Sequence, residues 1–550
     1  MSSIPAVRLR GLGVPVVLIG VSLLGGCGGG GAGTAASTPP SSSPGGTTTA
    51  GIDVVTYKYD LSRSGLNASE STLTPSNVNS SSFGLLRVLS VDGKVDGQPL
   101  YLSQLMIGGA AHNVVYAVTE NDSVYAFDAD SGMMLWQKSL LGSGETVSDS
   151  RSCDQVTPTI GITSTPVIDR GAGAHGVLYV VAMSLAAQAY HQRLHALDVT
   201  TGAEVFGGPM EITATYPNAS GTVSFDPGQY EERAALLLAN GIVYTSWTSH
   251  CDSAPYTGWI IGFDQTTLAR TSVLNVAPNS GGGGPAIWMA GGGPALDSSG
   301  NVYLLTANGA FETTLDANGF PNHQDYGNSF LKVSTANNTL TVSDYFAMSN
   351  EVDESNGDTD LGSGGEMLLP DLKDANGTVR HLVVGAGKDG NIYLVNRDSM
   401  GKFNAQGDQI WQELSNVLPG GVWGTPAYFN GTIYYGDSGG TLKAFLLSNA
   451  MLAANPSSQS STQFTYPGSA PAVSANGSAS GIVWAHENTD PAVLHAFDAT
   501  NLAHELYNSN QAANGRDHFG AGNKFITPVI TGGRVFVGTV NGVAQFGLLH

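Results

Sequence analysis

Short apolar runs alternate with polar turns from about residue 83 to the end of the chain. Residues 113–136 read "NVVYAVTENDSVYAFDADSGMMLW", which is an apolar strand, a polar turn, a second strand, a turn at Gly132 and a third strand ending at Trp136. β-Branched and aromatic runs bounded by Asn, Asp and Gly are typical of antiparallel strands joined by tight hairpins. This segment therefore predicts a three-stranded unit.

The same pattern recurs, so that the chain contains about eight units. The further copies lie at 176–206, 241–274, 300–334, 381–398, 431–445, 481–507 and 533–546. Another short apolar strand, often opened by proline as in "STPVID" and "ITPVIT", precedes each unit. Repeats of this length and strand content are typical of propeller blades. We therefore predict an all-β fold, a single eight-bladed β-propeller of four-stranded antiparallel blades over residues 83–550.

The last unit ends at His550 with its third strand, and the segment "FGLLRVLSVDG" (83–93) precedes the first proline-opened strand. A ring closes best when the two ends of the chain share a blade, because no sheet edge is then left open. We therefore predict that residues 85–90 form the outer strand of the final blade.

The pentapeptide "GDSGG" at 436–440 fits the G-x-S-x-G pattern of a nucleophile elbow. In the repeat, however, it occupies the hairpin between the second and third strands, where Asn, Asp and Gly supply the positive φ of tight turns. A nucleophile elbow also needs a helix after the turn, and the sequence predicts none there. We interpret Ser438 as a turn residue.

Composition agrees with a strand-rich exported protein. The chain has 73 Gly and only 12% charged residues, which suits short buried strands and tight turns. Its formal net charge is −22, so it repels phosphate backbones and nucleic-acid binding is not expected. The acidity otherwise suits solubility.

The N-terminus predicts export. Arg8 and Arg10 precede an apolar run that ends at Cys27 and is short for a membrane span, so residues 1–26 are typical of a signal peptide. The sequence "LGGC" at 24–27 resembles a bacterial lipobox, whose cysteine is acylated. The alternative is an ordinary signal peptide with a chance cysteine.

The following segment, 27–51, is rich in Gly, Ser, Thr and Pro and is predicted to be a flexible tether. Residues 52–82 form an N-terminal extension before the propeller. We expect an exported protein at the periplasmic or cell-surface face of a bacterial membrane, held there only by the lipid on Cys27.

Two cysteines remain, Cys153 and Cys251. The repeat places both in loops on the same face of the propeller, and export makes oxidation available. We predict a disulfide between them. The alternative is a pair of buried free thiols.

The run 126–132, followed by Trp136, resembles the repeat of PQQ-type (pyrroloquinoline-quinone-like) β-propellers. Asp128, Gly132 and Trp136 carry the resemblance, which implies that the tryptophan packs between neighbouring blades. Stretches such as "GITSTPVID" and "LGSGGEMLLPD" resemble exported bacterial propeller lipoproteins with this repeat still more closely. The resemblance implies the fold but not the activity, because enzymes and scaffolds share the repeat.

Three functions are compatible with this family. The first, which we favour, is a monomeric binding or assembly module that recognises a protein, a small molecule or a glycan, like the lipoprotein of the outer-membrane β-barrel assembly machinery. The second is a quinoprotein dehydrogenase, which implies PQQ, often Ca²⁺, and an adjacent-cysteine disulfide. This chain separates its cysteines and has no haem-attachment motif, so we expect neither cofactor. The third is a hydrolase or lyase acting at the channel mouth.

Long insertions on one face predict where a ligand binds. They span 139–162, 207–231, 248–258, 276–291, 307–326 and 347–365. The candidate ligand-binding residues are Arg151, His250, Asp252, Trp288, Glu312 and Glu366, each of which also suits a role in stabilising its loop. Trp288 is the leading candidate because the glycines around it leave an aromatic face open.

The acidic stretch "DESNGDTDLGSGGE" (353–366) resembles a Ca²⁺ loop, with Asp358 and Asp360 as candidate ligands. Its glycine falls too late for an EF-hand. The alternative is a solvated acidic loop.

Overall fold

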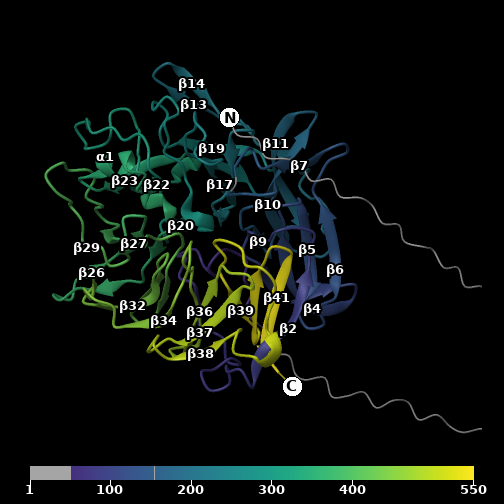
Figure 1. Cartoon of the computed structure of the whole chain (residues 1–550). Coiled ribbons are helices and arrows are strands. Elements are labelled where there is room, and N and C mark those ends of the chain that lie inside the picture. Colours follow the sequence, from purple (N-terminus) through teal and green to yellow (C-terminus); the bar gives the residue numbers. More distant parts are fainter. Residues whose placement is uncertain (1–50, 154, 550) are drawn as a thin grey trace, which may run out of the picture. The chain divides into compact units, whose positions relative to one another are not determined.

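The computed structural model describes residues 51–153 and 155–549, and these form an eight-bladed β-propeller (Figure 1). The predicted fold class is confirmed. The predicted signal peptide, most of the predicted tether and Cys27 lie outside the described residues. In the described part of the chain, no helix is long and apolar enough to cross a membrane.

Blades 1 to 4 each run from an inner to an outer strand in chain order. Blade 1 contains β3 (Leu100–Ile107), β4 (Ala110–Val118), β5 (Ser123–Asp128) and β6 (Met134–Ser139). Blade 2 contains β9 (Val167–Asp169), β10 (Val177–Ala186), β11 (Ala189–Asp198) and β12 (Met210–Glu211). Blade 3 contains β16 (Leu237–Ala239), β17 (Ile242–Ser249), β18 (Trp259–Asp264) and β19 (Arg270–Asn275). Blade 4 contains β20 (Ala295–Leu296), β21 (Asn301–Leu305), β22 (Ser329–Ser334) and β23 (Thr341–Ala347).

Blades 5 to 7 repeat this arrangement. Blade 5 contains β24 (Met367–Leu368), β27 (Leu382–Ala386), β28 (Ile392–Asn396) and β29 (Gln412–Leu414). Blade 6 contains β30 (Ala427–Phe429), β31 (Thr432–Gly436), β32 (Thr441–Ser448) and β34 (Ser458–Gln463), with β33 (Met451–Leu452) also on β32. Blade 7 contains β35 (Ala472–Asn476), β36 (Ala479–Glu487), β37 (Val493–Asp498) and β38 (Glu505–Asn508).

Blade 8 joins the two ends of the propeller sequence. It contains β39 (Val529–Thr531), β40 (Arg534–Gly538), β41 (Gly542–Leu548) and, as its outer strand, β2 (Phe83–Ser90). β2 pairs with β41 from Phe83 opposite Leu548 to Ser90 opposite Gly542, and the two strands lie side by side in Figure 1. The predicted closure by an N-terminal strand is confirmed.

Smaller elements decorate the blades. They are β1 (Leu66–Asn67), β7 (Thr146–Asp149), β8 (Thr159–Ile160), β13 (Thr215–Asn218), β14 (Gly221–Ser224), β15 (Tyr230–Glu231), β25 (Leu372–Lys373), β26 (Val379–Arg380), α1 (Glu351–Asn356), η1 (Met289–Gly291), η2 (Ala336–Asn338), η3 (Leu361–Ser363) and η4 (Ala513–Gly515). The short helix α1 lies in the acidic insertion. Three acidic residues occupy its first turn, where the partial positive charge of a helix N-terminus stabilises carboxylates.

The repeat residues pack neighbouring blades together. Trp136 on β6 donates its indole N–H to the carbonyl of Val199 in blade 2 at 3.0 Å, as the resemblance implies for this tryptophan. A Cβ on Gly202 would meet the Trp136 ring at 2.8 Å. Asp128 accepts the backbone N–H of Ser131 at 2.7 Å and closes the turn at Gly132, where φ is +77°. Each unit is thus built to pack on the next.

The "GDSGG" pentapeptide forms the hairpin turn between β31 and β32, as the repeat predicts. The buried carboxylate of Asp437 is paired with Lys443, and the Ser438 N–H donates to the carbonyl of Gly421 at 3.0 Å. Gly439 has a φ of +66°. A strand follows the turn where a nucleophile elbow requires a helix.

The N-terminal extension crosses the inner edges of the blades and closes one end of the channel. Its backbone carbonyls at residues 54, 55, 61, 62, 64 and 65 accept N–H groups from the inner strands of blades 1, 2, 4, 5, 6 and 7. The Tyr59 hydroxyl accepts the N–H of Ile530 in blade 8 at 2.7 Å. We call residues 52–70 the plug, because they turn the channel into a pocket open toward the loops that precede the inner strands.

Two buried cations fix the plug beneath that pocket. Lys58 donates to the carbonyls of Thr425 at 3.0 Å and Pro426 at 3.2 Å, and also to Pro471. Arg63 donates to the carbonyl of Pro294 through Nε at 3.0 Å and Nη2 at 2.8 Å. Burial lowers the pKa of Lys58 to about 7.

Candidate functional site

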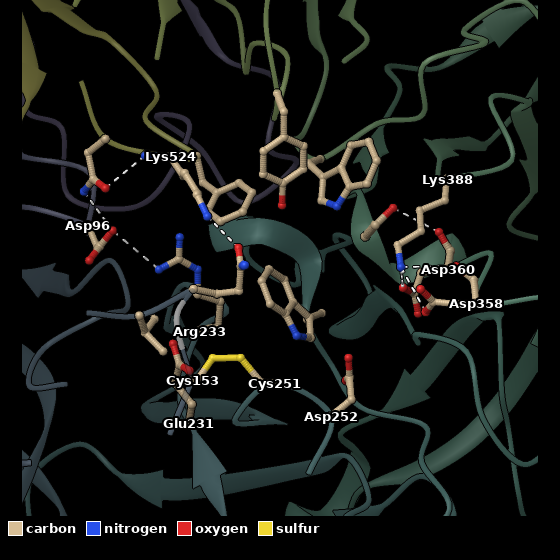
Figure 2. Close-up of a pocket in the computed structure, with 18 of the residues that line it drawn as sticks. Asp96, Cys153, Glu231, Arg233, Cys251, Asp252, Asp358, Asp360, Lys388 and Lys524 are labelled. Carbon is tan, nitrogen blue, oxygen red and sulfur yellow. Dashed lines mark hydrogen bonds and ion pairs between the residues drawn. A yellow bond between two sulfur atoms is a disulfide. The ribbon is translucent and has the colours of Figure 1, made fainter. Parts of the chain in front are cut away.

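The loop-rich face surrounds a central pocket of about 460 Å³ (Figure 2). Five of the six predicted long insertions contribute to its wall, through Cys153, Glu231, Asp252, Trp288 and Asp358. The insertion 307–326 is the exception. The predicted binding face therefore coincides with this cleft at the channel mouth.

Two aromatic pairs form much of the pocket wall. Trp288 meets Phe525 edge to face, with ring centroids 5.7 Å apart and planes at 78°. Trp423 meets Tyr466 in the same way at 5.3 Å and 76°. All four rings remain partly exposed to the pocket. They present flat apolar surfaces to which the ring of a ligand can bind.

A buried charge cluster forms one side of the pocket. The guanidinium of Arg233 lies 3.7 Å from the Asp96 carboxylate, and Lys94 lies 3.5 Å from the same carboxylate. Arg233 is only 3% exposed, and its Nε–H finds no hydrogen-bond acceptor among the described residues. One Asp96 oxygen, Oδ2, likewise accepts no hydrogen bond from the described residues. A buried guanidinium of this kind favours an anionic or strongly accepting ligand group.

The charge of Asp96 is maintained by its neighbours. Burial alone raises its pKa, but Lys94 and Arg233 outweigh burial and lower the pKa to about 2. Behind it lies Glu120, whose pKa is raised well above its usual value by burial and next by the Asp96 carboxylate. Glu120 accepts the Gly161 N–H at 2.7 Å.

The opposite side of the pocket carries the acidic insertion (Figure 2). Lys388 lies 2.5 Å from Asp360 and 3.1 Å from Asp358. The two predicted metal ligands therefore do come together, but around an ammonium group. Within residues 51–153 and 155–549, no group of three or more His, Cys, Asp or Glu side chains is arranged to hold a metal ion. A cation bound by Asp358 and Asp360 would have to displace Lys388.

Cys153 and Cys251 are joined by a disulfide, with their Cα atoms 5.4 Å apart. The bond ties the loop between blades 1 and 2 to the hairpin loop of blade 3 and lines the pocket. Its place on the pocket wall follows from the loop positions that the repeat predicts.

Three of the six candidate ligand residues lie at or near the pocket. Asp252 and Trp288 line it. His250 is buried just behind it, where its Nε2–H donates to the carbonyl of Tyr230 at 3.1 Å and its Nδ1 lies 3.5 Å from Glu231. Its ring supports the loop that carries Asp252.

The other three candidates lie elsewhere. Arg151, in the first long loop, stacks on the ring of Tyr190 in β11 at 4.1 Å and donates a hydrogen bond to its hydroxyl. Glu312 lies 2.7 Å from His323 in the fourth-blade insertion. Glu366 is fully buried beneath the pocket, where one oxygen accepts the Ala295 N–H at 3.0 Å and burial raises its pKa to about 8.

Sequence reasoning missed the charged and aromatic side chains that precede the inner strands. Asp96, Trp423 and Phe525 each stand three residues before the proline of such a strand, and Arg233 stands just before "AALLL". Because equivalent positions of every blade converge on the channel, this shared offset was a usable signal.

Comparison with known proteins gives the fold. No protein-family model matches the chain, and neither does any curated protein. Among solved structures, it is similar to the quinohemoprotein alcohol dehydrogenase from Comamonas testosteroni, with a TM-score of 0.57 and 14% identity over 90% of this chain and 80% of that one. A quinohemoprotein alcohol dehydrogenase from Pseudomonas putida HK5 gives 0.58 and 13% over the same shares.

A europium-containing methanol dehydrogenase gives a TM-score of 0.53 and 14% identity, over 89% of this chain and 90% of that one. At these identities the likeness concerns the fold alone. The resemblance of the repeat to PQQ-type propellers is thus confirmed at the level of the fold, which this chain shares with the quinoprotein dehydrogenases.

Proposed function

We propose that this chain is a binding module whose loop-rich face holds a small organic anion containing a ring, in the central pocket. The observation that carries this proposal is Arg233, a buried guanidinium with an unused Nε–H beside four partly exposed aromatic rings. The pocket volume of about 460 Å³ suits a small organic ligand. The ring of the ligand packs against Trp288 or Trp423, and its anionic group pairs with Arg233.

The pocket is much less acidic than the whole chain, because four cations face its five carboxylates, Asp96, Glu231, Asp252, Asp358 and Asp360. Four of the 22 Lys and Arg residues line this one pocket, namely Lys94, Arg233, Lys388 and Lys524. Lys388 pairs with Asp358 and Asp360 of the acidic insertion, and Lys94 shares Asp96 with Arg233. Hence the pocket wall carries cations in a protein whose net charge otherwise repels anions.

The test is a binding screen with a matched control. Small aromatic and sugar carboxylates are titrated against the wild type and followed by calorimetry, while the protein as purified is examined by native mass spectrometry for a retained ligand. Arg233→Gln and Trp288→Ala are expected to weaken binding about tenfold or more. Arg380→Gln is the control, because Arg380 also stacks on a tryptophan, Trp411 at 4.6 Å, and pairs with an aspartate outside the pocket.

Binding that is unchanged in Arg233→Gln, or that falls equally in Arg380→Gln, would count against the proposal. So would a wild-type protein that binds no carboxylate of the panel and retains no ligand.

A quinoprotein dehydrogenase is the second candidate, favoured by the shared fold and by a pocket that combines Trp288 with a disulfide. The quinone is a planar anion, which suits the rings and Arg233. The metal that such enzymes pair with it does not suit the described residues, because Lys388 occupies the carboxylate pair. Incubation with PQQ and Ca²⁺, then dye reduction over alcohols and sugars, separates the candidates: binding without turnover supports the first, and robust turnover supports the second.

We also propose that the module is exported and anchored through Cys27, from the lipobox and tether in the sequence. Membrane fractionation and mass spectrometry of the N-terminal peptide test this. The wild type is expected in the membrane fraction with a lipid on Cys27, and Cys27→Ala in the soluble fraction. An unmodified wild-type peptide would overturn the anchor and leave the pocket proposal untouched.

A further inference from the structure

A second cavity lies on the outer rim, between blades 3 and 4. It has a volume of about 520 Å³. Its floor is formed by β19 and β23, one wall by the hairpin of β13 and β14, and the other wall by the insertion 307–326. We call this cavity the rim groove. The insertion 307–326, which does not line the central pocket, lines this groove.

The two walls are fixed to each other by one side chain. Asn279 accepts the backbone N–H of Ala219, in the tip of the β13–β14 hairpin, at 2.7 Å. The same side chain donates to the carbonyl of His323 in the insertion at 2.6 Å, and its backbone N–H donates to Asp325 at 3.0 Å. The groove is therefore held open as a formed cavity rather than being a gap between two loose loops.

Aromatic rings line the groove from both walls. Tyr216 comes from the hairpin, while Phe320 and Tyr326 come from the insertion. Tyr326 and Phe320 are backed by Tyr345, with ring centroids 5.5 Å and 5.8 Å away. Their positions are thus fixed by packing, which lowers the entropy lost when a ligand stacks on them.

Several neutral polar groups line the groove. Asn275 is engaged within the fold, since its side-chain amide donates to the Thr257 hydroxyl at 2.7 Å. In the part of the chain that the structure describes, the Tyr216 hydroxyl and the amides of Asn322 and Gln324 find no hydrogen-bond partner. The groove is lined by no Lys or Arg among the described residues, and its one carboxylate, Asp316, accepts the N–H groups of Asn318 at 2.8 Å and Phe320 at 2.9 Å. A ligand recognised here needs apolar faces and many neutral hydroxyl or amide groups.

We propose that the rim groove binds a neutral oligosaccharide. A pyranose ring has an apolar C–H face that packs on an aromatic side chain, and its edge carries hydroxyls that amide and phenol groups recognise. The Asp316 carboxylate in the lining and the net charge of −22 disfavour an acidic glycan, although the Lys402 ammonium lies 4.2 Å from the centre of the Phe320 ring. The site is independent of the central pocket, whose ligand we propose to be an anion.

The experiment uses neutral hexasaccharides as probes: cello-, xylo-, manno-, malto- and chito-oligosaccharides, titrated against the full exported domain by calorimetry. At least one is expected to bind. Tyr216→Ala should weaken that binding about tenfold or more, and Tyr216→Phe, which removes only the hydroxyl, several-fold. Trp288→Ala, in the central pocket, should leave it unchanged. Circular dichroism and the thermal midpoint verify that each variant is folded.

Gln324→Ala and Asn322→Ala provide a second test of sugar binding in the groove. Both side chains are exposed, so their loss does not disturb the core. Each is expected to weaken binding several-fold. The proposal is overturned when no hexasaccharide binds at millimolar concentration. It is overturned equally when binding persists in Tyr216→Ala and Gln324→Ala, or when Trp288→Ala abolishes it, which would place the sugar in the central pocket.

Discussion

The guanidinium of Arg233 lies 4.7 Å from the centre of the Phe525 ring and packs against its face. The two residues come from blades 3 and 8, and each stands just before the inner strand of its blade. Their contact shows how the propeller builds its pocket: short loops at equivalent positions converge on the channel, and the ring shields the cation from water.

The first prediction concerns the pair of Arg233 and Asp96. Arg233→Gln is expected to lower the free energy of unfolding by about 3 kcal/mol, because it leaves the buried Asp96 carboxylate with Lys94 as its remaining cation. The double variant with Asp96→Asn should recover much of this loss. Urea unfolding of both single variants and the double variant measures the coupling, and strictly additive losses would contradict it.

The second prediction concerns the plug. Arg63 is fully buried and donates to backbone carbonyls of blade 4 and of the plug itself. Arg63→Met removes these charged hydrogen bonds and leaves their acceptors unpaired, so we expect a loss of about 3 kcal/mol or more in urea unfolding. The exposed Lys373→Met is the control and should change stability little. Equal stabilities of the two variants would show that the plug is not fastened by Arg63.

The blades were predictable from sequence because their determinants are local and repeated. The proline-opened inner strands, the turns with Asp128 and Gly132, and the closing strand at 83–90 all follow from strand alternation and turn chemistry. The plug was not predictable in the same way. Its backbone carbonyls accept hydrogen bonds from six of the blades through residues without periodicity, such as Leu61 and Ser64, whose partners lie hundreds of residues away.

The candidate site was predictable in part. Insertion length pointed to Trp288, Asp252 and the two cysteines, because long loops on one face of a propeller meet at the channel mouth. Insertion length alone does not distinguish loops that turn toward the channel from loops that fold toward the outer rim. Glu312 belongs to an insertion that packs against a neighbouring hairpin and builds the rim groove, a contact that depends on the tertiary partner Asn279.

The third prediction is a pH dependence. Burial raises the pKa of Glu366 to about 8, from an ordinary value of 4.5. Between these values the unfolded chain releases the proton while the folded chain keeps it. The free energy of unfolding therefore falls as the pH rises through this window, by about 1.4 kcal/mol per pH unit at most.

Glu366→Gln keeps the acceptor for the Ala295 N–H and removes the titration. Its stability relative to the wild type is expected to increase from pH 5 to pH 8, as measured by urea unfolding at a series of pH values. The exposed Asp371→Asn, at 72% side-chain exposure, serves as the control and should run parallel to the wild type. Parallel curves for Glu366→Gln as well would show that Glu366 does not titrate in this window.

The last prediction concerns the disulfide between Cys153 and Cys251. It closes a loop across 98 residues and pins two loops of the pocket wall. In the chain-entropy model, closing a loop of this size contributes about 4–5 kcal/mol, less any strain. Cys251→Ser is therefore expected to lower stability by several kcal/mol and to weaken the binding of the pocket ligand, because Asp252 and Gln155 lose their fixed positions. Peptide mapping of the purified protein without reductant should yield one peptide pair joined through these cysteines. Two thiols that react with an alkylating agent in the native protein would contradict the bond, and an unchanged ligand affinity in Cys251→Ser would show that it does not shape the pocket.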